Sequence, residues 1–247
     1  MRKRRSLGID LAVNPSKTAL AEIEWADGVA HVQAPRTRCV DGDIVSALTG
    51  LGPEDSAGID CPFGWPQAFV EAVAAHAAQQ RWPGHRDPVA HYELSRMRVT
   101  DRLVDGVVRR ILKRGPLSVS MDKLGAAAWR WACLADQLAT DGHPVDRSGA
   151  GRIAEVYPAG ARAVWGLQGD RSIERLLAVA PWLRFAPGAR AVFDQNEHAF
   201  DALVAALVAR AAVLGLTVLP AGEDERHAAQ VEGWIHLPVE GSLPKLI

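Results

Sequence analysis

The sequence is poor in cysteine, has almost no net charge and contains no long apolar run. Its three cysteines among 247 residues are scattered without a Cys-X-X-Cys pair, so neither a disulfide framework nor a zinc ribbon is expected. The formal net charge is -1, which excludes a strong overall field toward nucleic acid or membranes. No window approaches the roughly 18 apolar residues of a membrane helix. These absences predict a cytoplasmic protein without a membrane partner.

The composition is that of an ordinary globular protein. Hydrophobic residues make up 48% of the chain and charged residues 23%. A chain of 247 residues is long for one domain but within the range of α/β folds, and it can bury a sizeable core. We therefore expect one domain over residues 1–247.

Hydrophobic patterning predicts a mixed sheet. The first three expected strands follow one another closely, and Asp27-Gly28 between the second and third is a strong hairpin signal, so these strands should form an antiparallel meander. A helix and then a parallel strand ending at Asp60 should follow. We predict strands at about 7–13, 18–25, 29–37, 57–60 and 152–157.

Helical periodicity separates and follows these strands. Residues 82–145 are expected to form a helical insertion on the sheet. The last helix is rich in alanine, which would let it lie close to a sheet, and Gly215 should end it. This order of strands and helices is RNase H-like. We predict helices at about 44–51, 67–80, 101–113, 123–139, 159–165, 172–179 and 196–214, of which 101–113 and 123–139 lie within the insertion.

Three acidic residues lie in apolar strands. Asp10 and Asp60 each end a strand, and Glu155 is flanked by apolar neighbours. Burying an ionised carboxylate without a partner costs roughly several kcal/mol or more. A hard divalent cation bound to the carboxylate would remove that cost. Two alternatives stay open: the aspartates could cap turns, and Glu155 could pair with a buried arginine.

The last helix adds two more acidic residues on one face. Glu197 and Asp201 lie four residues apart, where like charges repel unless a cation binds them. The alternative is that both carboxylates interact favourably with the dipole at the N-terminal end of this helix. His198, one turn before Asp201, is interpreted as a surface histidine.

Several motifs together resemble one family. The chain is similar to the domain of unknown function 429 family, whose members are predicted RNase H-like nucleases. The likeness spans most of the chain. The motifs are Gly8-Ile9-Asp10-Leu11-Ala12, Gly58-Ile59-Asp60-Cys61-Pro62, Arg98-Val99-Thr100-Asp101, Glu155-Val156-Tyr157-Pro158-Ala159, Phe200-Asp201-Ala202-Leu203-Val204-Ala205-Ala206 and Glu232-Gly233-Trp234-Ile235.

The resemblance implies a nuclease-like acidic site at Asp10, Asp60, Glu155 and Asp201. The hypothesis is metal-dependent hydrolysis of phosphodiester bonds by two ions, Mg²⁺ or Mn²⁺, with Asp10 bridging them and Glu197 as a further ligand. The substrate would be a nucleic acid of unspecified type.

Two arginines and a threonine, within or just before the Arg98-Val99-Thr100-Asp101 motif, are candidates for substrate binding. Arg98 is expected to contact phosphate, because a guanidinium matches phosphate bidentately. Arg96 and Thr100 are further candidates for substrate contact.

Two other functions fit the expected topology. One is an actin-like phosphotransferase or ATPase, although no glycine-rich phosphate loop follows Asp10. The other is a non-catalytic RNase H-like scaffold that binds nucleic acid or protein.

Overall fold

One mixed sheet organises the described residues. The computed structural model describes residues 4–26, 28–122, 124–169 and 171–247. The strands run in the order β6-β5-β1-β2-β3-β7, and β4 pairs with β2. Their bounds are β1 Arg4–Asp10, β2 Ala19–Ala26, β3 Val29–Val32, β4 Arg36–Thr37, β5 Ser56–Asp60, β6 Ile153–Glu155 and β7 Leu183–Phe185.

The strand directions confirm the predicted mixed α/β class. β1, β2 and β3 form an antiparallel meander, whereas β5 is parallel to β1 and β6 is parallel to β5. Gly28, at the β2–β3 turn, has a φ of 74°, a value that favours glycine. Asp27, its predicted turn partner, lies outside the described residues. This architecture is consistent with an RNase H-like fold.

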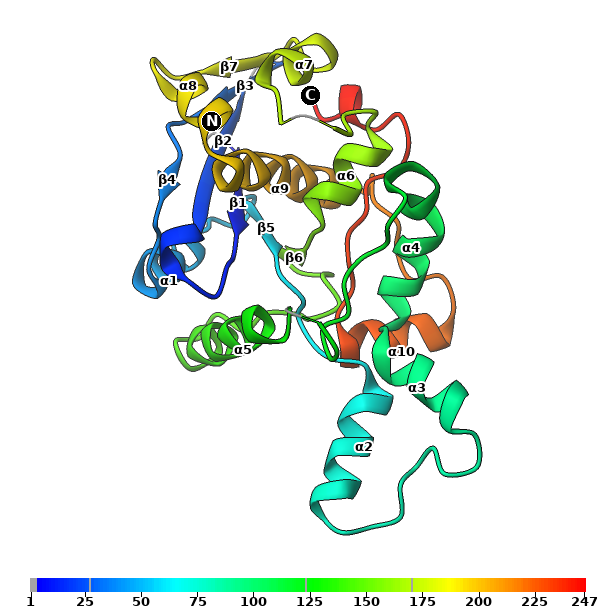
Figure 1. Ribbon diagram of the computed structural model, residues 1–247. Helices are drawn as coiled ribbons and strands as arrows, with labels where there is room; N and C mark the ends of the chain where they lie inside the picture. Colours follow the sequence, from blue (N-terminus) through cyan, green and yellow to red (C-terminus); the bar gives the residue numbers. More distant parts are fainter. Residues whose placement is uncertain (1–3, 27, 123, 170) are drawn as a thin grey trace.

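Helices cover both faces of the sheet (Figure 1). One face packs against α9, with α6, α7 and α8 beside it, and the other packs against α1 and α5. The bounds are α1 Asp41–Thr49, α2 Gln67–Ala77, α3 Pro88–Arg96, α4 Val99–Leu112, α5 Gly125–Thr140, α6 Pro158–Val164, α7 Ile173–Val179, α8 Ala189–Gln195, α9 Glu197–Val213 and α10 Glu223–Glu232.

Alternation along β1 and β5 assigns each side chain to a face. Leu7 and Ile9 belong to the apolar cluster under α1 and α5, so Gly8 and Asp10 face α9. A Cβ atom on Gly8 would lie 1.9 Å from the backbone oxygen of Ala202, and one on Gly58 would lie 2.5 Å from that of Ala205. The Gly-Ile-Asp repeat therefore lets α9 pack directly on the strands that end in Asp10 and Asp60.

The segment between β5 and β6 is helical. It contains α2, α3, α4 and α5. In Figure 1, α2 and α3 lie beyond the end of the sheet, and α4 stands beside α6 and α10. No described helix is long and apolar enough to span a bilayer.

The sequence did not predict α3, β7, α8 and α10. β7 has only three residues, so it is too short to show an alternating pattern. α10 begins with Glu223, Asp224 and Glu225, a favourable charge pattern for a helix start, but it buries only two alanines and Glu232. Its position depends on packing against α2 and α4 rather than on an apolar stripe.

Candidate functional site

Asp10 and Asp60 form the centre of the site. β1 and β5 are parallel and in register, with Asp10 directly opposite Asp60 at the ends of the two strands. Adjacent strands lie about 4.8 Å apart, so the two carboxylates are neighbours on the face covered by α9. In the described part of the chain, the Asp60 side chain has no hydrogen bond or ion pair.

Both carboxyl groups hold protons more tightly than usual. Burial raises the pKa of Asp10 to about 6, against an opposing effect of its hydrogen bond with His198. Burial also raises the pKa of Asp60 well above its ordinary value, and the charges of Asp10, Asp201 and Glu155 raise it further. Two neighbouring, partly desolvated carboxylates are unfavourable when both are ionised, so the pair favours a cation.

His198 is a partner of Asp10 that the sequence interpretation missed. Its Nδ1 atom lies 2.7 Å from Asp10 Oδ2. His198 stands in the first turn of α9, and its side chain is 30% exposed. The sequence predicts a surface histidine at position 198, whereas the structure holds the His198 ring against Asp10 of the acidic pair. Its position one turn before Asp201 was the available signal.

Asp201, on α9, lies on the side of the sheet that carries Asp10 and Asp60, but its carboxylate is paired with arginines. Arg171 donates from Nη2 and Nε to Asp201 Oδ2, at 2.6 and 3.0 Å. The Nε atom of Arg162 is 3.7 Å from Asp201 Oδ1, and both of these buried atoms lack a hydrogen bond in the described chain. Glu197, the other acidic residue of α9, is exposed and lies 3.4 Å from Arg171. Asp201 therefore approaches the acidic pair with its charge already compensated.

Glu155 points to the opposite face of the sheet. Its register partner on β5 is Ile59, one residue before Asp60, and registered residues of parallel strands share a face. Its carboxylate accepts hydrogen bonds from Arg98 at 2.6 and 2.8 Å and from the backbone of Phe63 at 2.8 Å. The open alternative for Glu155, a buried arginine partner, is the arrangement found.

Arg98 is enclosed by acidic side chains. It is 1% exposed, and its guanidinium also donates to Asp101 at 2.8 and 3.0 Å. Glu232 contributes its backbone oxygen to Arg98, and its carboxylate accepts from the backbone of Val99. These contacts fix the start of α4 against β6 and α10.

The other two predicted substrate-binding residues lie apart from the acidic pair. Arg96 is on the surface of α3, where it pairs with Glu93. Thr100 is buried, and its hydroxyl accepts from the backbone of Ile235. Neither side chain lines the cavity beside Asp60.

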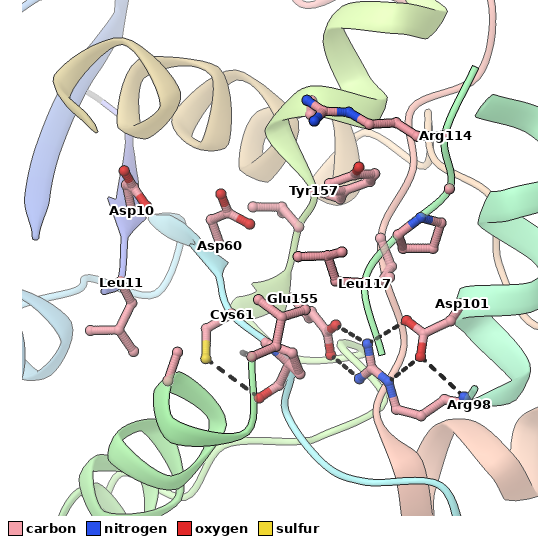
Figure 2. A pocket seen from close by; sticks show the side chains of 18 residues that line it. Asp10, Leu11, Asp60, Cys61, Arg98, Asp101, Arg114, Leu117, Glu155 and Tyr157 are labelled. Carbon is pink, nitrogen blue, oxygen red and sulfur yellow. Dashed lines mark hydrogen bonds and ion pairs between the residues drawn. The ribbon is translucent and has the colours of Figure 1, made fainter. Parts of the chain in front are cut away.

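A cavity of about 330 Å³ adjoins the acidic pair. Figure 2 shows Asp10 and Asp60 on one side of it and Tyr157 and Arg114 on the other, with the Arg98–Glu155 pair below. Cys61 also lines it, but burial raises the pKa of the thiol well above its ordinary value, so this group stays protonated. Within the described ranges, no three His, Cys, Asp or Glu side chains are grouped closely enough to hold a metal ion by themselves.

Comparison with known families agrees with the motif resemblance. A family model described as protein of unknown function (DUF429) matches residues 8–226. The chain belongs to the DUF429 family. No curated protein and no solved structure matches it. The DUF429 match covers the end of β1 together with β5, β6 and α9, and thus Asp10, Asp60, Glu155, Glu197 and Asp201.

Proposed function

We propose that this DUF429 protein is a divalent-metal-dependent nuclease that hydrolyses phosphodiester bonds beside Asp10 and Asp60. The observation that carries this proposal is the in-register pair of carboxylates at two parallel strand ends. Such strand ends are where open α/β sheets bind ligands. The unpaired Asp60 carboxylate would be satisfied by a cation.

The donor set fits Mg²⁺ or Mn²⁺. These ions prefer oxygen ligands, and Mg²⁺ is often held by one or two carboxylates together with water and substrate phosphate oxygens. Asp10 and Asp60 would hold the ion, and the buried, unbonded Oδ1 of Asp201 is the next available oxygen. When bound, a divalent ion supplies activation of water and stabilisation of charge on the phosphate.

The other predicted ligands limit the number of ions. A two-metal mechanism needs further carboxylates, but Glu155, which lines the same cavity, has its side chain on the other face of the sheet and is paired with Arg98. Asp201 would have to separate from Arg171 to bind an ion. We therefore propose one tightly held ion at Asp10 and Asp60, with any second ion weaker.

Several residues of the chain would orient this site. His198 fixes one oxygen of Asp10, and Arg171 fixes one oxygen of Asp201. The arginines near Asp201 also provide positive charge beside a phosphate-binding site in a protein whose overall charge is -1. A nucleic-acid partner would thus be recognised locally.

The proposed location is the cytoplasm. Cys39, Cys61 and Cys133 are all free, which suits a reducing compartment.

The decisive experiment is a cleavage assay on labelled single-stranded, duplex and junction DNA, RNA and RNA–DNA hybrid. Each is incubated with Mg²⁺, Mn²⁺ or EDTA. Wild type should cleave at least one substrate with metal, and Asp60→Asn should abolish cleavage. Asp141→Asn, at an exposed helix end away from the site, is the matched control.

Other outcomes support the alternatives. Equal cleavage by Asp60→Asn would refute the proposed site. Nucleic-acid binding without cleavage would favour the scaffold, which the pairing of Asp201 and Glu155 with arginines also fits. Nucleoside triphosphate hydrolysis without strand cleavage would favour the actin-like enzyme.

A further inference from the structure

The cavity beside Asp60 combines apolar walls with a few polar groups. It has a volume of about 330 Å³, at the lower end of the roughly 300–1000 Å³ of small-molecule sites. Leu11 and Pro62 line it beside the strand ends, and Leu117 and Leu124 line it from the helical segment. Its size and lining suit one small, partly apolar group rather than a continuous strand.

Three polar side chains of this cavity lack partners. Among the residues that the structure describes, the Asp60 carboxylate, the Tyr157 hydroxyl and the Arg114 guanidinium make no hydrogen bond or ion pair. Figure 2 shows the Arg114 side chain reaching over the Tyr157 ring on the side of the cavity away from Asp10. Polar groups that converge on one cavity without internal partners are typical of a ligand site.

Tyr157 lines the cavity on the same side as Arg114, across from Asp10 and Asp60 (Figure 2). Burial raises the pKa of the Tyr157 hydroxyl, so this group stays protonated and can donate a hydrogen bond to a ligand in the cavity.

We propose that this cavity binds a single unpaired nucleotide of the substrate. The base lies among Leu117, Leu124 and the other apolar side chains, within reach of the Tyr157 hydroxyl. Its phosphate is held near Asp60 and contacts Arg114, since guanidinium groups bind phosphate well. This inference rests on the proposed function, because the phosphate belongs to the same site, and it names single-stranded ends or short nucleotides as the substrate class.

Two physical arguments favour one nucleotide over duplex. A base inside a duplex is stacked and paired, so it must be extruded before it can enter a pocket, at a cost of roughly a few kcal/mol. Binding along a long backbone requires many Lys or Arg contacts to phosphate. The chain has a net charge of -1, so a site that contacts few phosphates is the better match.

The test is calorimetric binding of a nucleoside 5′-monophosphate with Mg²⁺ present. Inorganic phosphate and the free nucleoside are the two partial probes. The monophosphate should bind at least about tenfold more tightly than either, because it uses both the apolar walls and Arg114. Equal affinity for monophosphate and inorganic phosphate would overturn the proposal, because the apolar walls would then contribute nothing.

Variants with matched controls locate the binding. Leu117→Trp fills the cavity from a side chain that is 55% exposed, and Leu219→Trp makes the same change at a side chain that is 56% exposed elsewhere. Arg114→Ala removes the proposed phosphate contact, and Arg110→Ala removes the same charge from the exposed side of α4. Leu117→Trp and Arg114→Ala should each weaken binding about tenfold, and the controls should bind as wild type does.

The outcomes separate this proposal from the nuclease proposal. Metal-dependent cleavage that favours duplex interiors and is unchanged in Leu117→Trp would overturn the pocket and leave the nuclease intact. Tight monophosphate binding, weakened by Leu117→Trp, in a protein that cleaves no substrate would support the pocket and overturn the nuclease.

Discussion

The guanidinium of Arg98 and the carboxylate of Glu155 face each other in the protein interior, joined by two hydrogen bonds of 2.6 and 2.8 Å. The side chains are 1% and 2% exposed. Asp101 holds the remaining edge of the guanidinium, so two carboxylates surround one cation. This arrangement makes Arg98 a positioning residue for β6 and α4, and it removes Glu155 from the set of free carboxylates.

Replacing Arg98 should therefore lower the free energy of unfolding of the protein, and not only weaken substrate binding. Removing one partner of a buried ion pair leaves an uncompensated charge and costs about 3–5 kcal/mol. We expect Arg98→Ala to lose about that much in urea denaturation, and Arg96→Ala, on the surface, to lose less than about 0.5 kcal/mol. A normally stable Arg98→Ala protein with weakened substrate affinity would instead restore the prediction of a phosphate contact.

Removing the charge of Asp60 should stabilise the protein in a chelator. The pKa of Asp60 is raised by burial and by neighbouring negative charges, so its ionised form opposes folding at neutral pH. We expect Asp60→Asn in EDTA to melt a few degrees higher than wild type, as a gain of ~1 kcal/mol would produce. Adding Mn²⁺ should raise the melting temperature of wild type but not of the variant. A lower melting temperature for Asp60→Asn in EDTA would contradict this account.

The metal-free protein should become more stable as the pH falls from about 7.5 to about 5. Burial raises the pKa of Asp10 from its ordinary 3.8 to about 6, so the folded state binds its proton more tightly than the unfolded state. This contribution is fully present below the unfolded pKa and is lost as the pH rises through the folded pKa. We expect a difference of about 1 kcal/mol in urea denaturation with EDTA.

The variant Asp10→Asn provides the control for that pH dependence. It should show a flatter stability profile over the same pH range, because the titrating group is gone. A profile identical to that of wild type would assign the effect to other groups, with Asp60 the next to test.

The arginine partner of Asp201 should limit the number of bound ions. Titration of wild type with Mn²⁺, followed by electron paramagnetic resonance, should give one tightly bound ion per chain. In the wild-type protein, Asp201 Oδ2 accepts a hydrogen bond from Arg171 at 2.6 Å. Arg171→Met removes this donor, so it should strengthen the binding of a second ion. Arg190→Met, at an exposed pair on α8, should change nothing. Two equally tight ions in wild type would support the two-metal mechanism.

The close approach of α9 to β1 should make Gly8 intolerant of any side chain. A Cβ atom there would overlap the backbone of Ala202 and Ala206, at 1.9 and 2.3 Å, and backbone cannot rotate away. We expect Gly8→Ala to destabilise the fold by about 3 kcal/mol or more, as severe overpacking does. Gly106→Ala, on α4 with open space around it, should be neutral or stabilising. Similar denaturation midpoints for the two variants would contradict the packing described.

Much of the sheet could be predicted from the sequence, because local patterns determine it. The apolar strands around Ile9 and Ile59, the β2–β3 turn and the alanine-rich last helix all carry strong local signals. The same signals identified Asp10 and Asp60, since a carboxylate at the end of a buried strand is conspicuous. Short or polar elements such as β7 and α10 could not be predicted, because their stability comes from neighbours far away in the sequence.

The tertiary structure decided which charges stand together. Strand register, set by pairing between distant segments, aligns Asp60 with Asp10 but Glu155 with Ile59, and a shift of one residue reverses the face of a side chain. Arg98 is 57 residues from Glu155 in the sequence, and His198 is 188 from Asp10. No local pattern links such residues. The sequence by itself determined that carboxylates end the strands, and only the packing of α4 and α9 decided which of them lack a partner.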